Sequence, residues 1–218
     1  MSPNNGKGSS DMSDTIEFRV LELLNARLCH ELISPVGAIN NGVELLDDED
    51  PAFVRDAIQL IGQSARKAGQ RLQFYRFAYG SSASASAGGG GRELATALLE
   101  GGKVRCDWLP AAAALSLDWQ RLACNLLVLA AEILPRGGAV IVRPPAGGAA
   151  GVEVVAEGES INLTAELRAA LDPAVAVDQL SPRTIHGYFT ARLAGRMGAR
   201  LWLGEAKPQR ALFRATVG

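Results

Sequence analysis

The sequence predicts an α+β protein in which an N-terminal helical hairpin is followed by an α/β sandwich. Apolar residues recur every three or four positions between residues 15 and 79, which is the spacing of amphipathic helices. A run of glycine, serine and alanine at 80–91 interrupts this pattern and is typical of a flexible linker or loop. From 92 to 218, helix-like and strand-like segments alternate, which favours one mixed sheet with helices packed on a face.

Composition excludes several functional classes. With 218 residues, of which 48% are apolar and 21% charged, the chain resembles an ordinary soluble globular protein. The net charge is −1 and no block of lysine and arginine occurs, so we expect neither nucleic acid nor a membrane as a partner. Residues 1–14 are polar and lack a hydrophobic region, which predicts a disordered tail on a cytoplasmic protein instead of a signal peptide. The cysteines are few and widely spaced, which predicts buried reduced thiols and no metal site: Cys29, Cys106 and Cys124.

The first helix is expected at about 15–46. At about 100° per residue, its apolar residues fall within about 60° of one line: Leu21, Leu24, Leu28, Leu32, Val36, Ile39, Val43 and Leu46. His30 lies about 180° from that line, and Ser34, Gly37 and Asn41 share its side. We therefore expect His30 to point to water from a face of small and polar side chains.

The second helix is expected at about 52–79, after an acidic turn. Its apolar positions alternate in steps of four and three, the heptad spacing of a coiled coil: Val54, Ile58, Ile61, Ala65, Ala68, Leu72, Tyr75 and Tyr79. One hairpin cannot enclose the apolar stripes of both helices, because each helix leaves a flank uncovered. We therefore predict a homodimer in which two hairpins form a four-helix bundle.

The second domain is expected to contain four helices and five strands. The helices are predicted at 92–101, 118–134, 163–171 and 182–197, and the strands at 103–109, 139–143, 152–156, 199–204 and 210–217. The strands at 139–143 and 152–156 flank a turn rich in glycine and proline, so we expect them to pair.

His30 stands in the segment CHELISPVGAINNGVELL at 29–46. An imidazole keeps a nucleophilic nitrogen at cell pH, and a neighbouring carboxylate can accept its proton or a hydrogen bond from the ring. A lone surface histidine is most often only solvated. The order His-Glu-Leu-x-Ser-Pro-Val, however, resembles the H-box of sensor histidine kinases. In that family the histidine carries a phosphoryl group on a dimeric four-helix bundle. Ser34 stands where the family usually has threonine or asparagine.

The second domain resembles the ATP-binding (Bergerat-like) domain of histidine kinases and GHKL ATPases, but its nucleotide motifs are incomplete. In RLACNLLVLAAEILPRGG, the magnesium-binding asparagine of the family's N-box falls on Leu129 and the lysine on Glu132. In VEVVAEGESI, the adenine-recognising aspartate falls on Ala156 and the second glycine on Ser160. No glycine-rich lid follows. Leucine offers no oxygen to Mg²⁺, and alanine none to adenine, so we expect neither ATP binding nor autokinase activity.

This combination of an H-box hairpin and a degenerate ATPase-like domain resembles the ChpT-type histidine phosphotransferases of alphaproteobacteria. The resemblance implies a phosphotransferase in a multistep phosphorelay that controls the cell cycle. Such a protein accepts a phosphoryl group from the receiver domain of a hybrid histidine kinase (CckA-like). It passes the group on from phospho-His30 to response regulators (CtrA/CpdR-like). It would need no cofactor of its own, because the partner receiver domain supplies Mg²⁺.

The predicted site combines helix phase with this resemblance. His30 is the nucleophile, Glu31 is its orienter or base, and Ser34 positions the phosphoryl group or a water, or is only a solvated hydroxyl. The docking patch for receivers comprises Ile33, Gly37, Ala38, Asn40, Asn41 and Glu44. Ile33 and Asn40 lie at its edges.

Two other functional classes stay open. A divergent histidine kinase that uses ATP would show measurable ATP affinity. A non-enzymatic dimeric adaptor, or a module that sequesters receivers, would bind receivers while His30 is incidental.

Overall fold

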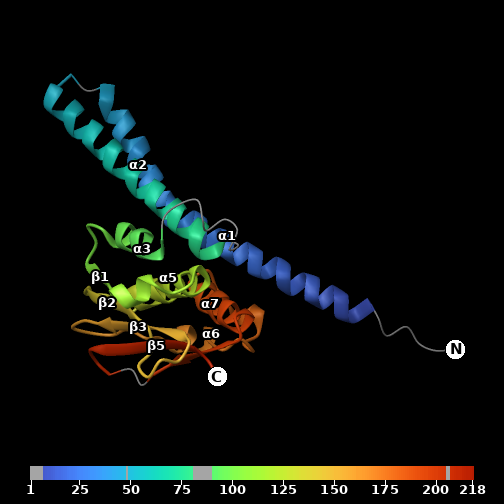
Figure 1. Ribbon diagram of the computed structural model, residues 1–218. Helices are drawn as coiled ribbons and strands as arrows, with labels where there is room; N and C mark the ends of the chain where they lie inside the picture. Colours follow the sequence, from blue (N-terminus) through green and yellow to red (C-terminus); the bar gives the residue numbers. More distant parts are fainter. Residues whose placement is uncertain (1–6, 48, 81–89, 205–206) are drawn as a thin grey trace.

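The computed structural model describes residues 7–47, 49–80, 90–204 and 207–218, with side chains described from Phe18 onward. The described chain is α+β: a long helical hairpin precedes a mixed sheet with helices packed on it (Figure 1). The fold class predicted from the sequence is therefore confirmed. Most of the predicted linker, residues 81–89, lies outside the described residues.

The hairpin consists of helices α1 (Lys7–Glu44) and α2 (Pro51–Tyr79), joined through the short 3₁₀ turn η1 (Leu45–Asp47). The Asp50 side chain caps α2 by accepting a hydrogen bond from the Ala52 N–H at 2.8 Å. Helix α1 starts at Lys7, so residues 7–14 are helical where a disordered tail was expected, while residues 1–6 lie outside the described residues. The physical reason is that extending an existing helix is far easier than starting one.

Helices α1 and α2 pack closely at Gly42. A Cβ atom there would lie 2.6 Å from Cγ1 of Ile61 and 3.3 Å from the Ala57 carbonyl oxygen. Pro35, about two turns earlier, is buried on nearly the same line of α1. The side of α1 that faces α2 therefore contains Pro35 and Gly42. It lies next to the apolar stripe that the sequence predicted.

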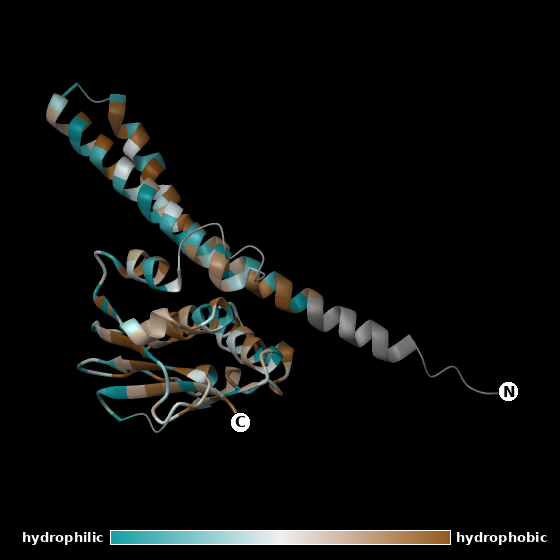
Figure 2. Ribbon diagram, viewed as in Figure 1, coloured by the Kyte–Doolittle hydropathy of each residue, from teal (hydrophilic) through white to brown (hydrophobic). Residues whose placement is uncertain are grey.

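That apolar stripe stays largely uncovered in the single chain. Hydrophobic residues alternate with hydrophilic ones along both hairpin helices (Figure 2). On each helix, the exposed apolar residues are rotated by about a quarter turn around the helix axis from the residues that face the other helix. Because the helices are antiparallel, both sets lie on the same side of the hairpin. We call this side the open stripe; it contains Leu21, Val36, Val43, Ile58 and Leu72, which are 46–59% exposed.

The second domain contains a five-stranded sheet within the described residues. Its strands are β1 (Val104–Trp108), β2 (Gly138–Arg143), β3 (Gly151–Glu157), β4 (Ala199–Leu203) and β5 (Arg210–Val217), in the spatial order β1-β2-β3-β5-β4. Strands β1 and β2 are parallel, and all other neighbours are antiparallel. The pairing of β2 with β3 confirms the predicted hairpin across the glycine- and proline-rich turn.

The helices cover one face of this sheet (Figure 1). They are α3 (Gly91–Leu99), α4 (Pro110–Ala113), α5 (Leu117–Glu132), α6 (Ala165–Ala170) and α7 (Ile185–Arg196), with a 3₁₀ turn η3 (Val177–Gln179). Helix α4 and the turn η3 were not predicted from the sequence, because three or four residues are too short for a periodic pattern. The core lies between α5 and the sheet, where Leu126, Val154 and Phe213 are fully buried.

The base of the hairpin is embedded in the second domain. From α2, Phe74 and Phe77 enter the main core. From α1, Leu23 packs in a second apolar cluster with Ile185 and Tyr188 of the α7 segment. These contacts place the middle of α1, where His30 lies, against the second domain.

Candidate functional site

His30 lies on α1, facing away from the open stripe. It is exposed, as the helix phase predicted, and it makes no hydrogen bond or ion pair with the residues that the structure describes. Ser34 follows one turn later and is exposed as well. Cys29 is also exposed, so the expectation of a buried thiol is wrong for this cysteine, because its helix phase turns it away from α2. Because the imidazole of His30 is exposed to solvent, its ring nitrogen can act as a nucleophile toward a group on a partner protein.

The six residues of the predicted docking patch lie on α1, on the side of His30. Ile33 is 69% exposed, so its aliphatic side chain is accessible to a partner. The others are exposed or half-buried: Gly37, Ala38, Asn40, Asn41 and Glu44. Their contact with a receiver domain stays a prediction.

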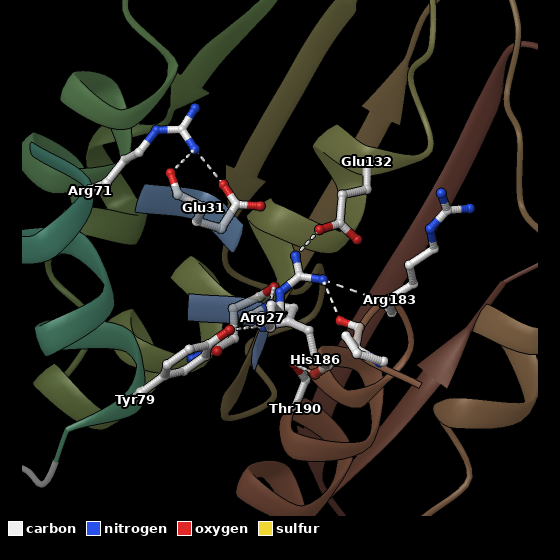
Figure 3. Close-up of polar contacts among 10 residues, drawn as sticks. Arg27, Glu31, Arg71, Tyr79, Glu132, Arg183, His186 and Thr190 are labelled. Carbon is white, nitrogen blue, oxygen red and sulfur yellow. Dashed lines mark hydrogen bonds and ion pairs between the residues drawn. The ribbon is translucent and has the colours of Figure 1, made fainter. Parts of the chain in front are cut away.

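Glu31 turns toward α2 instead of toward the imidazole of His30. Its carboxylate accepts a hydrogen bond and an ion pair from Arg71 of α2, and its backbone carbonyl accepts a second hydrogen bond from Arg71 at 3.0 Å (Figure 3). Adjacent residues of a helix point about 100° apart and do not face each other, which explains this geometry. The carboxylate of Glu31 is therefore paired with Arg71, and its role as orienter or base of His30 stays a prediction.

A cleft of about 720 Å³ opens beside His30, between α1 and the second domain. Ala26, Arg27, His30 and Glu31 line it from α1, and the second domain contributes Glu132, Ile133, Asn162, Thr164, Leu167, Ser181, Pro182, Arg183 and Thr184. This cleft could not be predicted from the sequence, because its two walls are distant in the chain.

Arg27 joins the two walls of the cleft. Its side chain is buried and forms an ion pair with Glu132 at the end of α5, and it donates to the backbone carbonyls of Arg183, at 3.3 Å, and Pro182, at 3.5 Å (Figure 3). Burial raises the pKa of Glu132, and the positive charge of Arg27 opposes that rise. One feature of the sequence could have pointed to Arg27. It is a charged residue about one helical turn before His30, and its side chain leaves the helix in a direction close to that of His30.

A buried histidine in the second domain fixes the end of the hairpin. The His186 Nε2–H donates to the Asn125 carbonyl oxygen at 3.0 Å, which leaves Nδ1 to accept from the Tyr79 hydroxyl at 2.7 Å. Burial, together with the nearby charge of Arg27, lowers the pKa of His186 to about 3. His186 is therefore neutral, enclosed and structural, in contrast to the exposed His30.

The free energy of unfolding is expected to fall as the pH drops below about 6.5. Folded His186 stays neutral down to its lowered pKa of about 3, whereas the unfolded chain takes up a proton near the ordinary value of 6.5. This stabilisation is complete above pH 6.5 and is lost by about 1.4 kcal/mol per pH unit as the pH falls toward 3.

Urea denaturation between about pH 7 and pH 5 measures this loss before most carboxylates titrate. His186→Gln keeps a donor for the Asn125 carbonyl and has no group that titrates. It should be less stable at pH 7 but lose less stability over this window. Parallel pH curves for wild type and variant would contradict the assignment.

Two positions at which the resemblance to the ATPases implies ligands for an Mg²⁺–ATP complex carry apolar residues in this chain. Leu129 and Ala156, at the positions that bind Mg²⁺ and adenine in the ATPases, have fully buried apolar side chains. Glu132, at the position of the N-box lysine, pairs with Arg27. Within the described residues, no group of three or more His, Cys, Asp or Glu side chains could hold a metal ion. The side chains of Leu129 and Ala156 therefore offer neither a nucleotide nor a metal ion a ligand atom.

The chain belongs to the histidine phosphotransferase family: residues 91–207 match the family model described as the histidine phosphotransferase C-terminal domain. Among curated proteins, it is similar to the protein phosphotransferase ChpT of Brucella abortus (strain 2308), with 42% identity over 124 residues. That match covers 56% of this chain and 58% of the length of the relative.

A solved structure of a bacterial phosphotransferase has the same fold. It superposes with a TM-score of 0.73 at 30% sequence identity, and the match covers 90% of this chain and 95% of that one. In the described part of the chain, no helix is both long and apolar enough to cross a membrane.

Proposed function

We propose that this chain is a histidine phosphotransferase of a multistep phosphorelay, with His30 as the residue that carries the phosphoryl group. One observation carries the proposal: the exposed His30, without a partner in the described residues, stands in an H-box-like segment of a chain from the histidine phosphotransferase family. Its similarity to ChpT supports the same activity.

The chemistry is a reversible in-line displacement. A neutral ring nitrogen of His30 attacks the phosphorus of an aspartyl phosphate, so that an N–P bond forms while the P–O bond to the receiver's aspartate breaks and its carboxylate leaves. The aspartate of a second receiver then reverses the step. Because the transition state is loose, catalysis consists mainly of positioning and charge neutralisation. The partner receiver supplies Mg²⁺ to neutralise phosphoryl charge, and this chain needs no cofactor of its own.

The partners follow from the same proposal. The receiver domain of a hybrid kinase (CckA-like) would donate the phosphoryl group, and response regulators (CtrA/CpdR-like) of the cell cycle would accept it in the cytoplasm. Both would dock on the side of α1 that carries His30, where Ile33 supplies an exposed apolar contact. Ser34, one turn beyond His30, would position the phosphoryl group or a water.

The functional unit would be a homodimer. The open stripe leaves five large aliphatic side chains about half exposed on one side of the hairpin, and burying them is worth about 25 cal/mol per Å² of apolar surface. His30 lies on the opposite side, so pairing two copies through the open stripe would leave both histidines accessible.

Replacing Val36 and Val43 together with glutamate should turn the dimer into a monomer. Each charge would have to enter the apolar interface twice, once per copy, which should weaken dimerisation by about 100-fold or more. Both side chains are exposed in the single chain, so the monomer should stay folded. Light scattering after size exclusion measures the mass; Gln63→Glu, on another face of α2, is the matched control. A variant that remains dimeric would exclude this interface.

Phosphoryl transfer in the absence of ATP tests the function. The purified chain is mixed with a receiver domain labelled on its aspartate, and a second, unlabelled receiver is added later. The proposal predicts label on the chain that then moves to the second receiver. Receiver binding without label would instead indicate an adaptor. Label from ATP alone would indicate a divergent kinase.

A further inference from the structure

Three arginines of the described residues line the cleft beside His30 or pair with a residue that lines it, and two of them are already neutralised. Arg27 pairs with Glu132, and Arg71 pairs with Glu31. Arg183 is the third; it is exposed and has no ion pair within the described part of the chain. Its charge is therefore available to a group that enters the cleft.

The backbone that carries Arg183 is held in place relative to α1. Arg27, one turn before His30, donates to the Arg183 carbonyl at 3.3 Å. On the other side, the Ser181 N–H donates to the Thr184 hydroxyl oxygen at 3.0 Å. The Arg183 side chain extends away from the guanidinium of Arg27 (Figure 3). Because its backbone is fixed and its cationic side chain has no ion pair in the described residues, Arg183 is suited to bind an anionic group that is present only during transfer.

We propose that the guanidinium of Arg183 binds the phosphoryl oxygens during transfer to and from His30. This inference rests on the proposed function and assigns the second domain a direct part in the chemistry. His30 lines this cleft from α1 and Arg183 lines it from the second domain, so a phosphoryl group on the imidazole enters the space that Arg183 also lines. A planar guanidinium donates two parallel hydrogen bonds to phosphoryl oxygens and stays charged throughout. It forms no covalent bond; it neutralises charge while the N–P bond forms and the P–O bond breaks.

The test separates this role from docking by using two phosphoryl donors. Phosphoramidate, a small donor that needs no docking surface, loads histidine directly with loss of ammonia. A labelled receiver domain, varied in concentration, gives the maximal rate and the half-saturating concentration. The variants are Arg183→Ala, Arg183→Lys and the control Arg200→Ala, an exposed arginine of β4 outside the cleft.

We expect Arg183→Ala to slow loading by about tenfold or more with both donors, because a charge-assisted hydrogen bond is lost in the transition state. The half-saturating receiver concentration should stay unchanged, Arg183→Lys should recover part of the rate, and Arg200→Ala should match wild type. Wild-type rates for Arg183→Ala, or a change only in the half-saturating concentration, would overturn the inference and leave the proposed function intact. Wild-type protein that neither donor loads would overturn both.

Discussion

Phosphoryl uptake from a receiver domain is expected to vanish when His30 is replaced by alanine. The described structure has one other histidine, His186, which is fully buried and holds hydrogen bonds at both ring nitrogens. No second imidazole can therefore replace His30 as the nucleophile. The loss should reach the detection limit, since removing the nucleophile of a covalent step removes the step. Labelled receiver and gel electrophoresis under neutral conditions measure it.

Two controls show whether the loss of phosphoryl uptake comes from the missing imidazole or from unfolding of the variant. His30 is exposed and makes no hydrogen bond or ion pair with the described residues, so His30→Ala should melt at the wild-type temperature and still bind the receiver. Cys29→Ser, at the exposed neighbouring position, should keep full activity. Residual stable label on His30→Ala would show that another residue carries the phosphoryl group.

Arg27→Ala is expected to destabilise the folded chain by about 3 kcal/mol, because removing one partner of a buried ion pair leaves the other charge uncompensated. This loss of unfolding free energy is at the lower end of the range for buried ion pairs, because the side chain of Glu132 is 35% exposed. The carbonyls of Pro182 and Arg183 also lose their donor. Urea denaturation at neutral pH gives the difference in unfolding free energy.

A double variant separates the ion pair from general packing. Arg27→Met combined with Glu132→Gln removes both charges while keeping most of the side-chain volume, and should be more stable than Arg27→Ala. The second domain would then still contact α1 through Leu23. Equal stability of wild type and Arg27→Ala would show that the contact between α1 and α5 is unimportant.

The parts of this molecule that are local in the sequence could be predicted from it. The periodicity of the two long helices, the turn between β2 and β3, and the exposure of His30 all follow from residues within a few positions of one another. The absence of oxygen ligands at Leu129 and Ala156 could also be read without coordinates, since it depends on residue type alone.

The remaining features depend on contacts between distant segments. The partner of Glu31 is Arg71, forty residues later, and the partner of Arg27 is Glu132 on another domain. No local pattern predicts either pair, because both arise from how α2 and α5 pack against α1. The apolar line of α1 was correctly identified as a stripe, yet the residues facing α2 are the small or rigid Gly42 and Pro35, which a hydrophobicity pattern does not weight.

Locating the phosphoryl group on the intact chain identifies the residue that carries it. Wild-type protein is incubated with a phosphorylated receiver and no ATP, kept at alkaline pH where phosphohistidine is stable, and analysed by peptide mass spectrometry. We expect a single modification, on His30, that disappears when a second receiver is added. A phosphoryl group on any other residue, or none while the receiver is bound, would contradict it.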